Sequence, residues 1–310
     1  MKHTILGAGG SIGNVLTHEL LKSKEDVRLV SRSNYSIIGT ESVKADITSY
    51  KETLNSVKGS DIVYLCAGLP YNSTVWDELW PKIMQNTIDA CKSTGAKLIF
   101  FDNVYMYGKV DGKMLESTPY NPCSKKGEIR AIIASRLEAE INHNNIKAII
   151  ARSADLYGPY ISQNSMPYFM AIEKMMQGKK AQWLVNAHKP HSFTYTIDCA
   201  KGLNLLAQKP ECFQQVWHLP TFNPPLDGEQ FIQLVAKEFG VAPNYTVLKK
   251  WMIRMAGFFN KTIYESYEML YQNELDYYFD SSKFNNYFNY KPTSYEQGVK
   301  ETVAFFKKQK

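Results

Sequence analysis

The chain has 310 residues, of which 44% are hydrophobic and 21% are charged. This length allows one large domain or two smaller ones, and the composition excludes a disordered, collagen-like or disulfide-stapled chain. The 36 basic and 30 acidic residues give a formal charge of +6 without a basic stripe, so nucleic acid is not expected as a partner. The five cysteines are scattered without a C-x-x-C pair, which is typical of a reduced cytosolic protein without structural zinc.

The first residues lead directly into a glycine cluster, and the apolar stretch before it is too short for the core of a signal peptide. No run reaches the roughly 18 uncharged apolar residues that a membrane-spanning helix needs. We therefore expect a soluble, cytoplasmic protein with no membrane partner.

Short β-rich runs alternate with amphipathic stretches through the first half of the chain. The pattern predicts strands at 3–6, 27–31, 62–66, 97–101 and 147–152, and helices at 12–23, 80–93 and 124–143. This alternation is typical of an α/β fold of the Rossmann type, a doubly wound parallel sheet with helices on both faces. After Gly158-Pro159 the pattern becomes irregular, and further helices are predicted at 166–177, 228–239 and 295–307.

The change in pattern also predicts how the chain divides. Residues 1–158 are expected to form a dinucleotide-binding domain, to which residues 181–220 return. Residues 159–180 and 221–310 are expected to form a smaller, mixed substrate-binding lobe. Aromatic residues are concentrated in the later half, as in Tyr277-Tyr278-Phe279, which favours a packed lobe core and the wall of a pocket.

The strongest local signal lies between the first predicted strand and the first predicted helix. It reads Gly7-Ala8-Gly9-Gly10-Ser11-Ile12-Gly13, a G-x-x-G-x-x-G spacing. Gly7 allows a tight turn, Gly10 lets the backbone approach a pyrophosphate, and Gly13 permits close packing of helix on strand. The unpaired N–H groups at the helix start would face the phosphates. A glycine-rich turn without a ligand is the alternative, but the position inside a βαβ unit favours dinucleotide binding.

The second predicted strand ends in Ser31-Arg32-Ser33, where an NAD-selective site usually has a carboxylate on the ribose hydroxyls. A guanidinium and two hydroxyls suit a 2′-phosphate, so Arg32 favours NADP over NAD. An arginine at the end of a strand is also often only solvated, which leaves NAD as the alternative cofactor.

Several short motifs follow the glycine loop in order. They are Asp46-Ile47, Cys66-Ala67-Gly68, Asn86, Tyr107-Gly108, the run from Arg152 to Pro159, and Tyr195-Thr196-Ile197-Asp198. Together with the glycine loop they resemble the extended short-chain dehydrogenase/reductase superfamily, which includes the NAD-dependent epimerases and dehydratases. The resemblance covers nearly the whole chain and implies the same fold with a nicotinamide cofactor.

The resemblance also implies contacts with cofactor, substrate and partner. Asp46 and Ile47 would meet the adenine, the cofactor would pass Cys66, Ala67, Gly68 and Asn86, and its nicotinamide side would be lined by Leu156 and Tyr157. A small-molecule substrate would bind in the cleft between the nucleotide domain and the C-terminal lobe. A homodimer would form through the helices predicted at 80–93 and 124–143.

The chain departs from this family where proton transfer is expected. Family members carry Tyr-x-x-x-Lys on the helix after the fifth strand. Here Pro122 and Gly127 set a register that places Lys126 at the tyrosine position and Arg130 at the lysine position, while Asn103 replaces the usual serine or threonine. The chain therefore looks like an atypical member that lacks the usual Tyr-x-x-x-Lys.

The altered positions leave several candidates for catalysis. Lys126 and Arg130 are four apart and share a helix face, so like-charge repulsion and partial burial would lower the pKa of the Lys126 ammonium and let it act as a general acid. Both side chains could instead anchor phosphate or carboxylate groups. Tyr105 is the preferred alternative proton donor, and it would project as Tyr107 does if the strand continues that far. Asn103 could donate a hydrogen bond to a substrate carbonyl.

Two further groups of polar residues are interpreted as structural. Asp102 could act as a base, but capping the following turn is the commoner role of such a residue. His188 and His191 are three apart and lack a third ligand at a convincing spacing, so no metal is expected.

These motifs predict an NAD(P)-dependent oxidoreductase, with NADP preferred, that acts on a small carbonyl or alcohol compound. A sugar-nucleotide epimerase or dehydratase is the alternative hypothesis. The length and the motif order favour it, whereas the loss of Tyr-x-x-x-Lys weakens it because such reactions begin with hydride abstraction assisted by a base. The same loss favours a third hypothesis, a non-catalytic NADP-binding sensor.

Overall fold

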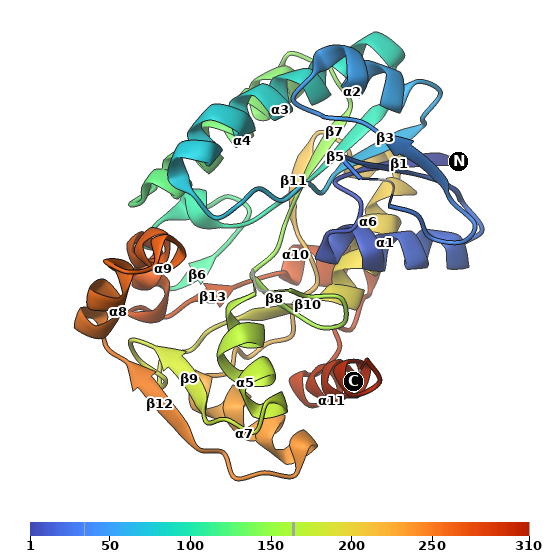
Figure 1. The fold of residues 1–310 in the computed structure, drawn as a ribbon. Helices are drawn as coiled ribbons and strands as arrows, with labels where there is room; N and C mark the ends of the chain where they lie inside the picture. The colour runs from blue at the N-terminus through green and yellow to red at the C-terminus, as the bar shows by residue number, and fades with distance from the viewer. Residues whose placement is uncertain (34, 163–164, 310) are drawn as a thin grey trace.

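The computed structural model describes residues 1–33, 35–162 and 165–309. In these residues a seven-stranded parallel sheet has the order β11-β7-β5-β4-β1-β2-β3 (Figure 1). The strands are β1 (Lys2–Leu6), β2 (Asp26–Ser31), β3 (Glu41–Lys44), β4 (Ile62–Leu65), β5 (Lys97–Asp102), β7 (Ala148–Arg152) and β11 (Gln215–His218). The order reverses between β1 and β4, which is where open parallel sheets hold ligands. The predicted doubly wound α/β fold is confirmed.

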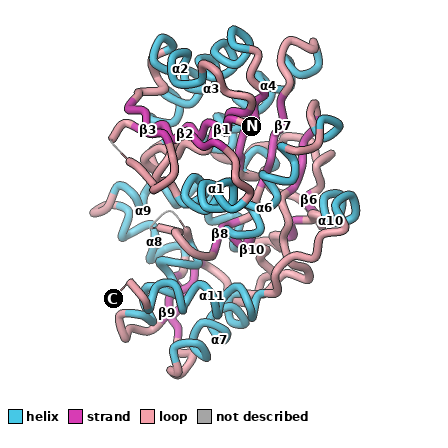
Figure 2. The backbone as a smooth tube through the Cα atoms, turned by 90° about the vertical axis from the view of Figure 1, so that its right-hand side faces the viewer, coloured by secondary structure: helices cyan, strands magenta, loops and turns pink. Residues whose placement is uncertain are grey.

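Helices cover both faces of the sheet, because neighbouring residues of each strand point to opposite sides. Leu98 packs towards one face and Ile99 towards the other. The first face is covered by α2 (Tyr50–Val57), α3 (Ser73–Thr94) and α4 (Lys125–Asn142), and the second by α1 (Ser11–Lys22), α6 (Thr196–Ala207) and α10 (Ser282–Phe288). Figure 2 shows α1 and α6 side by side below the sheet.

Helix α3 is longer than the helix predicted at 80–93. It begins at Ser73, where Asn72 Oδ1 accepts the Val75 N–H at 3.1 Å and so caps the helix. Pro81 lies inside the helix rather than in its first turn.

The remaining elements form a smaller lobe, which lies below the sheet in Figure 1. Its core is aromatic and contains the buried side chains of Trp183, Phe193 and Phe231. Its strands pair in parallel as β8 (Asp155–Tyr157) with β10 (Phe193–Tyr195), β9 (Ala181–Leu184) with β12 (Tyr245–Leu248), and β6 (Lys113–Met114) with β13 (Tyr278–Phe279). Its helices include α5 (Glu173–Met176), α7 (Gly228–Phe239), α8 (Lys250–Gly257), α9 (Lys261–Ser266) and α11 (Tyr295–Lys307).

The boundary between the two parts runs through the range 181–220. Of this range, α6 and β11 lie on the large sheet, whereas β9 pairs with β12 and β10 pairs with β8. The helix predicted at 166–177 is a π-helical segment, η2 (Tyr168–Ile172), followed by α5. Across the described ranges, no helix is long and apolar enough to cross a bilayer.

Candidate active site

The parallel strands of the large sheet bring the segments that follow them to one edge. The glycine loop follows β1, Arg32 follows β2, and Asp46-Ile47 lies just after β3. Cys66-Ala67-Gly68 follows β4, and Asn103 begins the segment after β5. The candidate cofactor residues and the candidate catalytic residues therefore lie along the same edge of the sheet.

The glycine loop has no room for side chains at its tightest points. Gly7 has a φ of +97°, and a Cβ atom there would lie 2.4 Å from Ala67 Cα. A Cβ atom on Gly13 would lie 3.1 Å from the Gly7 carbonyl oxygen. Gly10 is the N-cap of α1 and offers no side chain to cap the helix, so the first N–H groups remain for a ligand. These residues fit the diphosphate of a dinucleotide.

The loop after β3 is tied to α3. Asp46 Oδ1 accepts the Thr48 N–H at 2.9 Å, which holds the pKa of the Asp46 carboxyl below its ordinary value. Asn86 Nδ2 donates to the Ile47 carbonyl at 3.1 Å. Arg32 is exposed nearby, and its charge also lowers the Asp46 pKa. Asp46 and Ile47, which were expected to meet the adenine, and the cofactor candidate Asn86 are thus neighbours.

Two other cofactor candidates are buried. Cys66 is only 8% exposed, and burial raises the pKa of its thiol to about 12, so the thiol is neutral. Tyr157 is 1% exposed and packs against Tyr195 and Phe231 in the core of the C-terminal lobe. The Tyr157 side chain is therefore not available to a ligand. Leu156 is half-buried.

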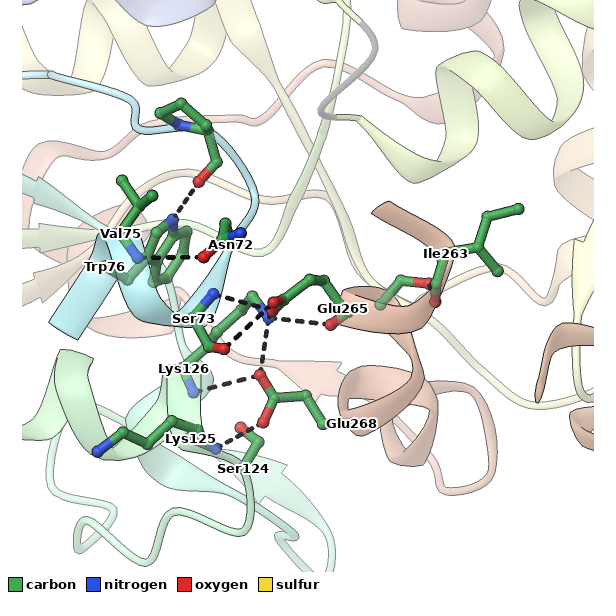
Figure 3. Close-up of polar contacts among 12 residues, drawn as sticks. Asn72, Ser73, Val75, Trp76, Ser124, Lys125, Lys126, Ile263, Glu265 and Glu268 are labelled. Carbon is green, nitrogen blue, oxygen red and sulfur yellow. Dashed lines mark hydrogen bonds and ion pairs between the residues drawn. The ribbon is translucent and has the colours of Figure 1, made fainter. Parts of the chain in front are cut away.

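Lys126, at the family's tyrosine position, is held in an ion cluster with Glu265 and Glu268 (Figure 3). Its Nζ donates to Glu265 Oε2 at 2.7 Å, to the Glu265 carbonyl at 2.9 Å and to Glu268 Oε1 at 2.8 Å. These bonds use all three N–H donors of an ammonium group. Although burial opposes it, bonds from Lys126 and Ser73 hold the pKa of the Glu265 carboxyl below its ordinary value. The cluster joins α4 and α3 to the C-terminal lobe.

Arg130, at the family's lysine position, has a different partner. Its Nε donates to Asp102 Oδ1 at 2.8 Å, and its guanidinium lies 4.5 Å from the ring centroid of Trp80. Lys126 and Arg130 do lie on the buried face of α4. Each of these two cations is paired with its own carboxylate, which the sequence did not predict.

Asp102 also has a structural position. It is buried, and its Oδ2 lies 3.5 Å from Nε of Arg152. Its Oδ1 accepts the Asn103 backbone N–H at 2.9 Å. With Arg130 on the same oxygen, both carboxylate oxygens are engaged inside the protein, which agrees with the expected capping role rather than with a base.

Tyr105 and Tyr107 do not project the same way, because β5 has ended and residues 105–107 form a 3₁₀ turn. Asn103 Oδ1 accepts the Tyr105 N–H at 3.1 Å and so holds this turn. The Tyr107 hydroxyl lies between Arg152 Nη1 and His218 Nε2, 2.8 Å from each. Tyr105 lines a cavity instead. Burial raises the pKa of Tyr105, so its phenol stays protonated and can donate a hydrogen bond.

The cavity beside Tyr105 has a volume of about 570 Å³ and extends into the C-terminal lobe. Its wall is largely apolar and includes Met166, Phe169, Leu248, Ile253 and Met269. Among the lining residues that the structure describes, Asp155 is the only charged one. A chamber of this size and character suits a small organic molecule.

The sequence analysis missed the pairing of Asp155 with His191. Asp155 Oδ2 lies 2.9 Å from His191 Nε2, and the imidazole is buried between the rings of Tyr277 and Phe193. The parallel pairing of β8 with β10 brings the two residues together. A carboxylate held by an imidazole on a cavity wall can accept a proton from a ligand. Asp155 lies in the segment expected near the nicotinamide, but nothing local in the sequence indicates its partner.

Comparison with known proteins shows the family to which the chain is similar. Residues 3–218 match the model of the NAD dependent epimerase/dehydratase family. The chain is 24% identical over 239 residues to YtcB, an uncharacterized UDP-glucose epimerase of Bacillus subtilis, covering 68% of this chain and 73% of YtcB. It is 25% identical over 181 residues to a dTDP-glucose 4,6-dehydratase of Mycobacterium tuberculosis, covering 52% of this chain and 55% of that protein.

Solved structures share the whole fold. A dTDP-glucose 4,6-dehydratase of Bacillus anthracis in complex with NAD has a TM-score of 0.82 at 17% identity, covering 99% of this chain and 97% of that one. A UDP-glucuronic acid 4-epimerase of Bacillus cereus, in complex with UDP-glucuronic acid and NAD, has a TM-score of 0.80 at 20% identity and full coverage of both chains. With the family model matching more than two thirds of its length, the chain belongs to the NAD-dependent epimerase/dehydratase family.

Proposed function

We propose that the protein binds NAD at the glycine loop and catalyses a reaction of the epimerase or dehydratase type, in which a substrate hydroxyl is oxidised first. The supporting observation is the cavity, which starts at Tyr105 and Asp155, in the segments after β5 and β7. It therefore begins at the sheet edge that carries the glycine loop. A bound nicotinamide would accept the hydride and later return it. The relatives are named as sugar-nucleotide enzymes, which supports a sugar-derived substrate over a simple carbonyl compound.

In this proposal Asp155 accepts the proton that leaves the hydroxyl, and His191 holds the carboxylate in position. Lys126 is not available for this step, because its three N–H donors are already used. The protonated phenol of Tyr105 would donate a hydrogen bond to the substrate oxygen. Asn103 acts by holding the turn that carries Tyr105.

The cavity wall limits which part of a sugar nucleotide can enter. No cation among the described lining residues compensates a diphosphate, and the one charged group, Asp155, would repel it. The sugar, or another neutral part of the substrate, would occupy the cavity while the charged part stays outside the apolar wall.

The choice of cofactor belongs to the same proposal. The neighbouring structures contain NAD, which supports NAD here. Arg32 supports NADP as the alternative, because its exposed guanidinium lies just after β2 and could bind a 2′-phosphate. Affinities for both reduced cofactors should therefore be measured before any assay.

Product analysis by NMR tests the reaction. With NAD⁺ and UDP-glucose, UDP-glucuronic acid or dTDP-glucose, we expect an epimerised or dehydrated sugar without a net change in NADH absorbance. Asp155→Asn should lower kcat by about a hundredfold or more, as loss of an acid–base group does. Asp276→Asn, which removes an exposed carboxylate paired with Lys189, is the matched control and should leave kcat unchanged. Absence of turnover of all three sugars would overturn the proposal if the cofactor still binds. Reduction of aldehydes or ketones with NADPH would favour the small-carbonyl reductase instead.

The ion cluster at Lys126 favours a second function, a non-catalytic dinucleotide sensor. The family position for proton transfer is used there to hold the lobe, while the glycine loop is intact. A sensor would bind cofactor without turnover and would bind a partner only when loaded. Dimerisation through α3 and α4, which pack against each other, is part of this proposal, and mass measurement with and without cofactor tests it.

A further inference from the structure

Helices α8 and α9 form a hairpin, residues 250–266, at the edge of the C-terminal lobe (Figure 1). Exposed apolar side chains cluster on this hairpin. The described residues include thirteen large apolar side chains that are exposed, and five of them lie here. They are Trp251 (61% exposed), Met255 (57%), Phe258 (79%), Phe259 (93%) and Tyr264 (69%). Single exposed apolar residues are normal on proteins, but a cluster on one hairpin indicates a contact surface.

Helix α8 is apolar on two faces. Met252 and Ile253 line the cavity, whereas Trp251 and Met255, which are one turn apart, are exposed. A helix with apolar residues on both sides is normally covered on both sides. The lobe covers the inner face of α8, and no described part of the chain covers the outer face.

The charges at this tip that face solvent are mostly positive, because Glu265 and Glu268 at its base are paired with Lys126. Residues 245–264 include Lys249, Lys250, Arg254 and Lys261 and contain no Asp or Glu. All four cationic residues are exposed. Lys250 pairs with Glu274 from outside the hairpin, and the other three form no ion pair within the described residues. Aromatic side chains surrounded by cations complement a partner that has an apolar interior beneath an anionic surface layer.

We propose that this hairpin docks the protein on the surface of a membrane that contains anionic lipids. Phe258 and Phe259 enter the boundary between headgroups and acyl chains, Trp251 lies at headgroup level, and the cations face lipid phosphates. The expectation of no membrane partner rested on the lack of a spanning segment, which surface docking does not require.

The hairpin is held rigidly on the rest of the protein. Glu265, near the end of α9, and Glu268, two residues after it, bind Lys126 of α4. Glu265 also accepts the Ser73 N–H at 2.9 Å (Figure 3). Rigid attachment matters because a tip that is fixed in space loses less conformational entropy when it binds a surface.

A second copy of this chain complements the tip less well than a lipid surface does. A two-fold contact would place the same patch against itself. The cations of residues 245–264 would then face the same cations, with no carboxylate from this segment between them. Self-association through the hairpin is therefore an outcome that the experiment must distinguish.

Co-sedimentation of the full chain with vesicles tests the proposal. The wild type should bind phosphatidylcholine vesicles that contain phosphatidylglycerol and bind pure phosphatidylcholine weakly. The double variant Phe258→Ser/Phe259→Ser should lose about tenfold or more in partitioning, and Lys249→Glu/Arg254→Glu should lose the preference for phosphatidylglycerol. Ile38→Ser removes a side chain that is 99% exposed elsewhere and should bind as the wild type does.

Three results would overturn the proposal. They are absence of wild-type binding to the anionic vesicles, equal binding by the wild type and Phe258→Ser/Phe259→Ser, and a wild-type dimer that this variant converts to a monomer. Thermal midpoints should be unchanged, because all the substituted side chains are exposed. The experiment needs no cofactor and no substrate, so its failure would leave the proposed catalytic function untouched.

Discussion

The glycine loop and the start of α4, the two ends of the candidate site, differ in the partners of their residues. At the glycine loop, a Cβ atom on Gly7 would overlap Ala67 and one on Gly13 would crowd the Gly7 carbonyl, and the helix start has no capping side chain. At the start of α4, Lys126 and Arg130 occupy the family's proton-transfer positions and are both paired with buried carboxylates. The first end keeps a ligand-binding geometry, whereas the second has become a contact that holds parts of the protein together.

This difference shows that a motif position does not determine its own chemistry. A lysine in the place of a tyrosine can be buried only if its charge is paired and hydrogen-bonded. Glu265 and Glu268, from a distant part of the chain, supply that pairing. Once they do, the ammonium has no free donor for a substrate.

Gly7→Ala should have the largest effect, because it distorts the glycine loop that is proposed to bind the cofactor. The new Cβ atom would lie 2.4 Å from Ala67 Cα at a φ of +97°, so the loop must change conformation. We expect the dissociation constant for NAD, measured by calorimetry, to rise about a hundredfold or more, equivalent to ~3 kcal/mol. Gly112→Ala is the control, since its φ is +85° and no atom lies within 4 Å of the new Cβ. Unchanged affinity in Gly7→Ala would contradict the account.

Lys126→Ala should destabilise the fold, because it removes the cation of the ion cluster at the start of α4. It leaves the buried carboxylate of Glu265 without its cation, which costs about 3–5 kcal/mol in the free energy of unfolding. Lys125→Ala removes a neighbouring lysine whose ion pair with Asp77 is exposed, so it should cost less than about 1 kcal/mol in urea unfolding. Equal stabilities of the two variants would mean that the ion cluster does not hold the lobe.

The buried His218 should make the free energy of unfolding depend on pH. Burial lowers the pKa of His218 to about 3, so below pH 6.5 the unfolded chain binds a proton that the folded chain does not. This group then lowers the free energy of unfolding by about 1.4 kcal/mol for each pH unit below 6.5. Between pH 7 and pH 5, His218→Gln should therefore lose about 2 kcal/mol less stability than the wild type. The same loss in both proteins would show that His218 is not buried in its neutral form.

Arg32→Asp should have the smallest effect and concerns only the choice of cofactor. Arg32 is exposed, so its loss should leave the fold intact. Affinity for NADPH should fall about tenfold, equivalent to the ~1.4 kcal/mol expected for one hydrogen bond to a charged group, while affinity for NADH should not fall. Lys308→Asp makes the same charge change at an exposed residue after α11 and is the control. If neither affinity changes, Arg32 is only solvated and NADP has no support from this residue.

Sequence reasoning succeeded where structure depends on local pattern. The helices predicted at 228–239 and 295–307 coincide with α7 and α11, and α7 has a capping box formed by Asp227 and Gln230. The parallel sheet followed from the alternation of strand and helix. In the candidate site, the register that places Lys126 and Arg130 on one buried face of α4 also came from local spacing.

Contacts between distant residues were beyond such reasoning. Lys126 meets Glu265 only because the C-terminal lobe docks on α4, and Asp155 meets His191 only because β8 pairs with β10. Tyr105 was expected on an extended strand, but the chain turns after β5. The docking of one lobe on the other decides these contacts, and no spacing within the motif contains that information.

Calorimetric titration of NAD⁺ into the wild type and into Lys126→Met compares the two ends of the site most directly. If the glycine loop binds the cofactor and Lys126 serves only the protein interior, both proteins should bind one equivalent with similar dissociation constants, provided that circular dichroism shows both to be folded. A folded Lys126→Met that loses NAD⁺, or a wild type that releases no heat of binding, would contradict the account.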